Sequence, residues 1–344
     1  MVARGEAALR DVPDPAPAAD EVLIRPVQAG ICGTDLHILY DGALIDEEAQ
    51  LPLTLGHEFV GEVVEGPREP GPSPYPALAR PLQPGTRVTV EPLLPCGRCG
   101  HCLRGRPNLC RAMSHLGIWR DGCMAELVRA PALRVVPVPD ELDDAQAALI
   151  ELFACGVNFA EKGELTPGAV CVVVGGGPVG IATAQCAVAA GAAHVLLVEP
   201  QAPRAELARR AGAGEVHGSF ATARAALDEL TDGGGADVVF ECVGAEGAIR
   251  DAIAYAGKGG RVVMAGIPTR EVRLDWTCVV TDELRLVGAF ASAWAFDRAI
   301  AWTVAGRLRP QALLTAVHDL SDGVGALARA ASDPDQCKIH LRVA

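Results

Sequence analysis

The stretch AVCVVVGGGPVG, residues 169–180, decides the fold of the second half of the chain. Its apolar run 169–174 predicts a buried strand, and the glycine turn that follows opens an Ala-rich segment with helical character up to Ala190. A strand, a glycine turn and a helix in this order are typical of dinucleotide binding, because backbone N–H groups and the helix N-terminus can meet a pyrophosphate. The turn residues expected to hold the cofactor are Gly175, Gly177, Pro178, Val179 and Gly180.

Strand and helix patterns alternate after this turn, which predicts a parallel, doubly wound sheet. Further strands are expected at 194–198, 237–241, 260–265 and 284–288, and helices at 203–211, 246–255 and 295–305. Glu199 ends the first of these strands, where a carboxylate accepts the adenosine ribose 2′-hydroxyl and repels a 2′-phosphate, so the pattern favours NAD over NADP. Arg204, at the start of the next helix, is added to the expected cofactor-binding residues. The alternative is a plain glycine turn beside a surface glutamate.

The first half of the chain has a different pattern. Short strands are expected at 21–27, 59–64 and 87–90, with a hint of another at 7–10, and Gly and Pro lie between them. Many short strands before any long helix predict an irregular barrel, and the Pro-rich segment 66–84 is expected to be an exposed loop. The expected domains are a catalytic domain at 1–152 with a cysteine lobe at about 94–112, a dinucleotide-binding domain at 153–292, and a return to the first domain at 293–344.

Composition excludes several functions. The 344 residues carry a formal net charge of −13, which disfavours binding to nucleic acid or to an anionic membrane. No run has the length and apolarity of a membrane helix, and residues 1–20 lack the apolar core of a signal peptide. Four of the 12 cysteines lie between 96 and 110 and the others are scattered, unlike the disulfide framework of a small secreted domain. We therefore expect a cytoplasmic protein that binds neither nucleic acid nor membrane.

The four clustered cysteines have the spacing of a metal site, Cys96-x2-Cys99-x2-Cys102-x7-Cys110. Four thiolates on one glycine-containing loop can wrap a tetrahedral Zn²⁺ and leave no open coordination position. We therefore expect a structural zinc, against the alternative of unpaired or disulfide-bonded cysteines.

A second set of potential ligands is spread along the chain. Cys32 lies in a segment that also carries Thr34 and His37. Further along the chain come His57 and Glu58, and Glu151 precedes the dinucleotide-binding domain. Thiolate, imidazole and carboxylate suit a catalytic zinc that keeps a position for water or substrate. Each residue taken singly also fits buried packing or a solvated surface, so the residues alone leave the joint site open.

These motifs together resemble the zinc-dependent medium-chain alcohol dehydrogenases over nearly the whole chain. The matching segments are Gly30-Ile31-Cys32-Gly33-Thr34-Asp35, Gly56-His57-Glu58-x2-Gly61, the four cysteines, Asp121-Gly122-Cys123-Met124-Ala125-Glu126 and the glycine turn. Gly266-Ile267-Pro268 and Leu274-Asp275-Trp276-Thr277 bring the chain nearest to the polyol and L-threonine 3-dehydrogenase branch.

The resemblance implies a GroES-like catalytic domain joined to a Rossmann domain, with two zinc ions per chain and NAD as the cofactor. It implies that Cys32, His57 and Glu151 bind the catalytic zinc, and that Glu58 lies close to the metal and exchanges with water or substrate. Thr34 matches the hydroxyl of a proton relay, His37 matches its outer end, and Asp35 matches a supporting residue. A bound zinc in such enzymes acts as a Lewis acid on the alcohol oxygen, and hydride passes to the nicotinamide.

The implied reaction oxidises a secondary alcohol to a ketone, with a polyol, a cyclitol, an amino alcohol or a 3-hydroxy amino acid as substrate, in a homodimer or homotetramer. The chain departs from its relatives in Leu152 after Glu151 and in Asn158, where threonine-type enzymes often carry His. It also starts late, so either the first strand of its relatives is missing or the native N-terminus lies upstream of Met1. His115 and Trp119 are weighed as substrate contacts against packing. The rival functions are a zinc-free quinone or enoyl reductase and a non-catalytic dinucleotide-binding protein.

Overall fold

The computed structural model describes residues 1–45, 50–69, 71 and 73–343. The chain forms two compact units, one made of Met1–Glu151 and Leu314–Ala344 and the other of Leu152–Leu313. Among the described residues, no helix is both long enough and apolar enough to cross a membrane.

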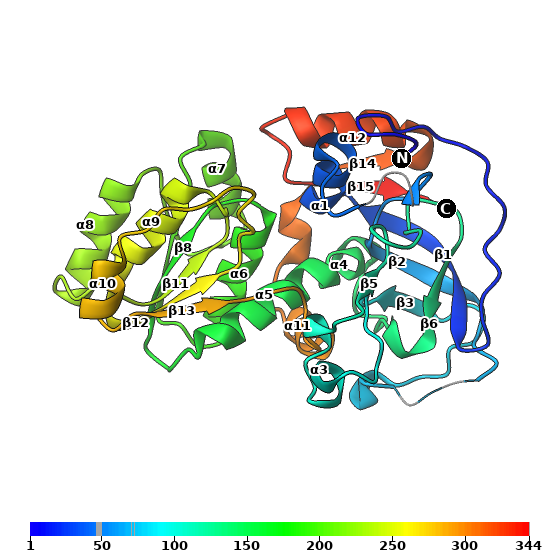
Figure 1. Ribbon diagram of the computed structural model, residues 1–344, viewed down its shortest axis with the longest axis horizontal. Helices are drawn as coiled ribbons and strands as arrows, with labels where there is room; N and C mark the ends of the chain where they lie inside the picture. The colour runs from blue at the N-terminus through cyan, green and yellow to red at the C-terminus, as the bar shows by residue number, and fades with distance from the viewer. Residues whose placement is uncertain (46–49, 70, 72, 344) are drawn as a thin grey trace. The chain divides into compact units, whose positions relative to one another are not determined.

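The first unit is built on an irregular seven-stranded sheet (Figure 1). Its strands are β1 (Glu21–Gly30), β2 (Glu58–Glu65), β3 (Arg87–Val90), β6 (Val128–Pro131), β7 (Val135–Pro137), β14 (Leu314–Asp319) and β15 (Lys338–Arg342). The strand β1 pairs antiparallel with β2, β6 and β15, and its register against β2 shifts between Pro26 and Gln28. Such a shift is expected at Pro26, which has no N–H to donate to the ladder. The predicted irregular barrel is confirmed, and one of its walls comes from the far end of the chain.

The remaining elements of this unit are short. They are α1 (Gly33–Leu36), η1 (His37–Asp41), η2 (Pro76–Leu78), α3 (Gly100–Leu103), η3 (Pro107–Leu109), η4 (Ala132–Arg134), α4 (Asp144–Ala148), η6 (Leu320–Asp322), α12 (Gly323–Ser332) and the two-stranded sheet of β4 (Leu93–Leu94) and β5 (Ser114–His115). The hint of a strand at 7–10 was wrong, because these residues form no strand and Leu9 is 60% exposed.

The Pro-rich loop is less exposed than predicted. Tyr75 is buried, and its hydroxyl donates to Glu91 Oε2 at 3.0 Å. Arg134 Nη1 donates to the same oxygen at 2.7 Å, so the loop is held by a buried ion pair. The rest of the described loop lies largely at the surface, as its proline content predicts.

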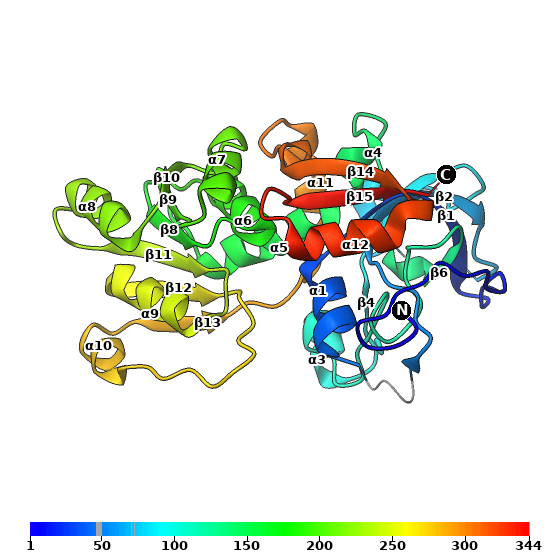
Figure 2. The same cartoon turned by 90° about the horizontal axis from the view of Figure 1, so that it is seen from above.

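The second unit holds a six-stranded parallel sheet in the order β10-β9-β8-β11-β12-β13. Its elements are α5 (Ile150–Gly163), β8 (Val170–Val174), α6 (Pro178–Ala189), β9 (His194–Val198), α7 (Ala202–Arg210), β10 (Glu215–His217), α8 (Phe220–Thr231), β11 (Ala236–Glu241), α9 (Glu246–Tyr255), β12 (Ala256–Met264), α10 (Trp276–Thr281), β13 (Arg285–Gly288), α11 (Phe296–Val304) and η5 (Pro310–Leu313). Figures 1 and 2 show this sheet with its flanking helices.

The strand order reverses at β8, so the right-handed crossovers place α6 and α9 on opposite faces of the sheet. Their apolar sides cover the strands, whose residues Val172, Val239 and Val262 are fully buried. This is the order of a dinucleotide-binding fold, with the ligand expected beyond the carboxyl ends of the strands near the reversal. The predicted doubly wound sheet is confirmed.

One expected boundary lies elsewhere. The return to the first unit begins at Leu314, and not at residue 293. The segment between these positions includes α11, whose Arg298 Nε forms an ion pair with Glu161 Oε1 of α5 at 2.5 Å. Arg309 N further along donates to Gln185 Oε1 of α6 at 2.7 Å. These contacts tie residues 293–313 to the second unit.

Candidate metal and cofactor sites

Asp35 is the fixed point of the first candidate site. Strand β1 ends at Gly30, and the chain turns into α1 with Cys32 as its N-cap residue. The buried Asp35 carboxylate accepts from Cys32 N at 2.8 Å and from Gly56 N at 3.0 Å. It therefore joins two segments that are far apart in sequence, the turn that carries Cys32 and the turn that leads to His57.

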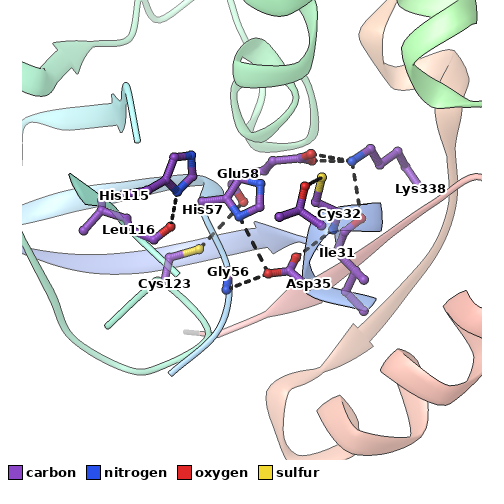
Figure 3. A network of polar contacts seen from close by, with 11 residues as sticks. Ile31, Cys32, Asp35, Gly56, His57, Glu58, His115, Leu116, Cys123 and Lys338 are labelled. Atoms are coloured by element: carbon purple, nitrogen blue, oxygen red, sulfur yellow. Dashed lines mark hydrogen bonds and ion pairs between the residues drawn. The ribbon is translucent and has the colours of Figure 1, made fainter. Parts of the chain in front are cut away.

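The two turns bring three potential metal ligands together. One ligand atom each of Cys32, His57 and Glu58 lies within 4.8 Å of the others, and we call these residues the Cys32 cluster (Figure 3). His57 and Glu58 are buried and Cys32 is partly buried. A thiolate, an imidazole and a carboxylate at this separation fit Zn²⁺, which accepts all three types of ligand.

The electrostatics of the cluster favour charge. Burial opposes ionisation of Asp35, yet the charge of His57 and hydrogen bonds from backbone N–H groups hold the pKa of this carboxyl below its usual value. Burial likewise opposes a charged His57, but Asp35 and Cys32 raise the pKa of the imidazole well above 6.5. Asp35 Oδ1 lies 3.6 Å from His57 Nδ1 and favours a proton on that nitrogen. The Nε2 nitrogen is then the one left for a metal.

Lys338 is a site residue that the sequence analysis missed. It begins β15, is 2% exposed, and its Nζ lies 2.5 Å and 2.6 Å from the two carboxylate oxygens of Glu58. Its Nζ also donates to Ile31 O at 3.3 Å. Burial disfavours its charge, but Glu58 and Cys32 raise the pKa of Lys338 above its usual value. The one signal in the sequence was a lysine at the start of the terminal strand, which did not identify a partner 280 positions away.

Glu151 is placed differently from the other expected ligands. It lies buried in the first turn of α5. Its carboxylate does not belong to the group of converging ligand atoms found among the described residues. Its charge contributes to the raised pKa of Lys338. The structure thus puts Glu151 in the electrostatic surroundings of Glu58 and Lys338, and its role as a zinc ligand stays a prediction.

The two expected relay residues occupy different environments. Thr34 Oγ1 lies 3.7 Å from Cys32 Sγ and is partly buried. His37 is exposed, and its Nδ1 lies 2.8 Å from Asp41 Oδ2. One residue is therefore beside the ligand cluster and the other in contact with solvent, and their relay roles stay predictions.

His115 contacts a residue of the Cys32 cluster, whereas Trp119 bonds to a different segment. The His115 ring meets the His57 ring edge to face, with centroids 5.1 Å apart and planes at 79°. Its Nδ1 lies 2.6 Å from Leu116 O. Burial, followed by the charge of His57, lowers the pKa of His115 to about 3. Trp119 is 41% exposed and donates its indole N–H to Leu44 O at 2.7 Å, away from the cluster.

The second candidate metal site is the four-cysteine lobe, formed by Cys96, Cys99, Cys102 and Cys110. Their sulfur atoms all lie within 4.8 Å of one another, and no disulfide joins them. Cys99 Sγ lies 3.5 Å from Cys102 Sγ and 3.9 Å from Cys110 Sγ. Tetrahedral Zn–S bonds of about 2.3 Å require sulfur atoms about 3.8 Å apart, so the separations fit zinc.

The thiols of the lobe cannot all ionise without a cation. Backbone N–H groups, led by that of Cys102, lower the pKa of Cys99 to about 5. Desolvation and the neighbouring Cys99 and Cys110 raise the pKa of Cys102 to about 12. A bound Zn²⁺ removes this conflict, because it binds each sulfur as a thiolate.

The glycine turn of the second unit has the geometry that a phosphate-binding turn requires. Gly175 has φ of +104°, and Gly177 is the N-cap residue of α6, with Pro178 and Val179 in its first turn. A Cβ on Gly180 would lie 1.8 Å from Gly175 O, so only glycine allows this close packing of helix and strand. The backbone at the start of α6 can therefore approach a pyrophosphate.

Glu199 lies directly beside this turn. It is 5% exposed, its Oε2 accepts from Gly176 N at 2.8 Å, and its Oε1 accepts from Gln201 N at 2.8 Å. Arg204 is partly buried on α7. The structure brings the expected ribose acceptor and the glycine turn together, and their contacts to a cofactor stay predictions.

Comparison with known proteins identifies the class. Residues 18–140 match the family described as "Alcohol dehydrogenase GroES-like domain" and residues 178–305 the family described as "Zinc-binding dehydrogenase". An L-threonine 3-dehydrogenase of Streptomyces coelicolor is 39% identical over 285 residues, 82% of this chain and 80% of that protein. A sorbitol dehydrogenase of Bacillus subtilis is 31% identical over 337 residues, 96% of this chain and 92% of that protein.

A solved structure agrees with these matches. The crystal structure of a zinc-binding dehydrogenase of Sinorhizobium meliloti 1021, bound to NADP, superposes with a TM-score of 0.86 at 30% identity, covering 98% of this chain and 96% of that one. Fold and matches together define a dehydrogenase with a GroES-like and a nucleotide-binding part. The chain belongs to the zinc-dependent medium-chain alcohol dehydrogenase family and is an oxidoreductase. The predicted family and fold class are confirmed.

Proposed function

We propose that this enzyme oxidises a secondary alcohol to a ketone with NAD⁺, at a zinc ion held in the Cys32 cluster. The observation that carries the proposal is the convergence of Cys32, His57 and Glu58 within 4.8 Å, around a buried carboxylate that fixes both turns. A zinc ion bound there supplies a Lewis acid that makes the alcohol O–H more acidic. Substrates in the proposed range are polyols, cyclitols, amino alcohols and 3-hydroxy amino acids.

The residues of the chain then have separate tasks. Asp35 orients His57 through Nδ1, and it holds the backbone of Cys32 so that the thiolate stays in place. Thr34, beside Cys32, takes the proton that the alcohol loses, and the exposed His37 passes it to solvent. Exposure at one end and partial burial at the other let the proton leave without opening the cluster to bulk water.

Glu58 and Glu151 are both proposed to serve the metal. Glu58 converges with Cys32 and His57 but is also paired with Lys338. Glu151 lies outside the converging group and is one of the charges that act on Lys338. We infer that Lys338 holds Glu58 when the metal does not, so Glu58 can exchange with water or substrate while Glu151 completes the ligand set.

The proposed cofactor is NAD and not NADP. Glu199 sets its carboxylate against the backbone of the glycine turn, where it can accept from a ribose 2′-hydroxyl and would repel a 2′-phosphate. Arg204 lies on the following helix as a further contact. The relative from Sinorhizobium meliloti was solved with NADP, and in this chain Glu199 is the residue that favours NAD.

The four-cysteine lobe is proposed to hold a second, structural zinc ion. Its four thiols saturate a tetrahedral ion, so no position is left for substrate. The two sites give two zinc ions per chain with different tasks.

We further propose a homodimer or homotetramer in the cytoplasm. The helix α10, which precedes the edge strand β13, carries exposed apolar side chains, with Trp276 59% and Val280 73% exposed. A second copy of the chain could cover them. All 12 cysteines are free thiols, which suits a reducing compartment.

The test is an NAD⁺-reduction screen over polyols, aminocyclitols, threonine and simple secondary alcohols, with zinc quantified on the same sample and NADP⁺ run in parallel. The proposal predicts NADH formation that a chelator abolishes. Turnover of quinones or enones without zinc would establish the zinc-free reductase instead. Cofactor binding with no chelator-sensitive turnover on any alcohol would establish a non-catalytic dinucleotide-binding protein.

A further inference from the structure

The His115 ring presents one unused nitrogen beside the Cys32 cluster. Because Nδ1 lies 2.6 Å from a carbonyl oxygen, that nitrogen must carry the proton and donate to Leu116 O. The Nε2 nitrogen is then an acceptor with a free lone pair. No hydrogen bond reaches it from the part of the chain that the structure describes, and it is not among the fully enclosed polar atoms that lack a partner. It is thus open to an incoming group.

The position of this nitrogen is fixed by two rigid attachments. His115 lies on β5, paired with Leu93 of β4, and its carbonyl oxygen accepts from Trp119 N at 3.0 Å. The turn that follows is bonded to the segment before His57, with Gly122 N donating to Thr54 O at 2.8 Å and Cys123 N to Gly56 O at 3.0 Å.

Two glycines allow the turn after His115 to lie directly against the backbone of Gly56. A Cβ on Gly122 would lie 2.0 Å from Gly56 O, and one on Gly117 would lie 2.6 Å from the same atom. The two backbones can approach this far only because neither residue has a side chain. His115 is therefore held relative to His57 by backbone contacts and not only by the ring contact.

The two rings are also oriented alike. In Figure 3, the Nδ1 atom of each ring points toward its partner, Leu116 O for His115 and Asp35 for His57. The other nitrogen of each ring lies on the opposite side. A group bound through Nε2 of His57 would therefore share one side of the site with the free lone pair of His115.

We propose that His115 contacts the substrate, and that its Nε2 accepts a hydrogen bond from an O–H or N–H group on the carbon next to the carbinol. The inference rests on the proposed function, since the carbinol oxygen must sit on the metal side of His57. With the ring centroids 5.1 Å apart, the second donor has to be close to the first oxygen, as it is in a vicinal diol or amino alcohol. A simple secondary alcohol leaves this acceptor unused.

The consequence is a preference for substrates with two adjacent polar groups. An acceptor that is filled by the right substrate and left empty by its analogue discriminates between the two. The site therefore selects diols, polyols and vicinal amino alcohols over mono-alcohols of the same carbon skeleton.

The experiment compares kcat/KM for 2,3-butanediol, 3-amino-2-butanol and 2-butanol in the wild type and in three variants at His115. His115→Gln keeps an acceptor at about the reach of Nε2, whereas His115→Asn can replace only Nδ1. His115→Phe keeps the ring and its edge contact with His57 but has no acceptor. We expect His115→Phe and His115→Asn to lower kcat/KM for the substrates with two polar groups about tenfold, mainly through KM, with kcat/KM for 2-butanol nearly unchanged. We expect His115→Gln to stay close to wild type on all three substrates. The diol and the amino alcohol are separate arms that tell which donor the site prefers.

Zinc content and NADH binding are measured on every variant, because a purely structural residue would change them or would lower all three substrates equally. An equal loss of kcat/KM on 2-butanol and on the diol overturns the inference. So does a ratio of kcat/KM for the diol to kcat/KM for 2-butanol that is unchanged in both His115→Phe and His115→Asn. If His115→Phe or His115→Asn does not fold, the comparison of His115→Gln with the one that folds decides the question. A wild type that holds zinc yet oxidises no alcohol overturns the proposed function and the inference with it, whereas an active wild type with unaltered ratios overturns the inference alone.

Discussion

The four-cysteine lobe and the Cys32 cluster lie in the same unit and are built in opposite ways. The lobe takes its potential ligands from one loop of 15 residues, all of them partly exposed thiols. The cluster takes three different potential ligands from two strand ends, and two of them are buried. Among the described residues, no buried carboxylate or ammonium is bonded to the four cysteines of the lobe, while the cluster has Asp35 on one side and Lys338 on the other.

The two sites are therefore suited to different roles. Four identical ligands close a tetrahedron and leave nothing for chemistry, whereas a mixed set with a lysine-bound carboxylate can change its coordination. A local site needs only its loop, but a site assembled from distant segments needs other charges to hold it. The following substitutions test this contrast, beginning with the largest expected effect.

Replacement of Lys338 should have the largest effect, and it should depend on zinc. Lys338→Met leaves the buried Glu58 carboxylate without its partner, which costs about 3–5 kcal/mol of unfolding free energy in the metal-free protein. Zinc offsets part of this loss, because the metal supplies a positive charge to the same carboxylate. Urea unfolding with zinc and with chelator measures both values.

The control for this variant is Lys162→Met, which removes an exposed lysine and should leave stability nearly unchanged. An equal loss with and without zinc would show that Lys338 and the metal do not share Glu58.

His340 should make the unfolding free energy of the metal-free protein sensitive to acid. Burial lowers the pKa of His340 to about 4, so between pH 6.5 and 4 the unfolded chain binds a proton that the folded chain does not. Its contribution is fully present above pH 6.5 and is lost as the pH falls toward 4, by up to about 3 kcal/mol. Unfolding of the wild type and of His340→Asn at pH 7.5 and 5 measures the difference, since the amide oxygen of Asn can replace Nδ1 and still accept from Gln28. Equal pH slopes in the two proteins would refute the assignment.

Asp35→Asn should weaken zinc at the cluster and leave the lobe unaffected. Asn has one acceptor oxygen to face the two N–H groups of Cys32 and Gly56. We expect the zinc affinity of the cluster to fall about 10–100-fold, measured by competition with a chelator. Asp41→Asn is the matched control, because Asp41 is exposed and contacts only His37 among the residues of the site. Loss of the lobe zinc in Asp35→Asn would contradict the independence of the two sites.

Cys102→Ser should have the smallest effect on turnover. The lobe loses its zinc and thermal stability falls, while the cluster keeps its metal and most of its activity. Zinc content, melting temperature and NADH formation are measured beside Cys278→Ser, whose cysteine lies outside both sites. Complete loss of turnover with the cluster zinc retained would show that the lobe takes part in the reaction.

The local features of the molecule could be predicted from the sequence. The cysteine spacing predicts the lobe because all four cysteines lie on one loop. The glycine turn predicts the nucleotide-binding fold because strand, turn and helix are contiguous in the sequence. The strand at 87–90 and the helix at 246–255 were predicted with their observed bounds.

Features that depend on distant pairing could not be predicted. The partner of Glu58 lies 280 positions away, and the pairing arises only because β15 joins β1 in one sheet. The burial of Tyr75 depends on the ion pair of Glu91 with Arg134, which nothing in a Pro-rich loop indicates. The predicted boundary at residue 293 lies too early in the chain, since the return to the first unit begins at Leu314. The helix α11 has an ordinary amphipathic pattern, and only its contact with Glu161 shows to which unit it belongs.

The proposed catalytic zinc in the Cys32 cluster is tested most directly by counting zinc and measuring NADH formation on the same preparations of the wild type and Cys32→Ser. We expect about two zinc ions per chain in the wild type, about one in the variant, and turnover abolished with the lobe intact. A variant that keeps both ions and its activity, or an active wild type that binds zinc only in the lobe, would contradict this proposal.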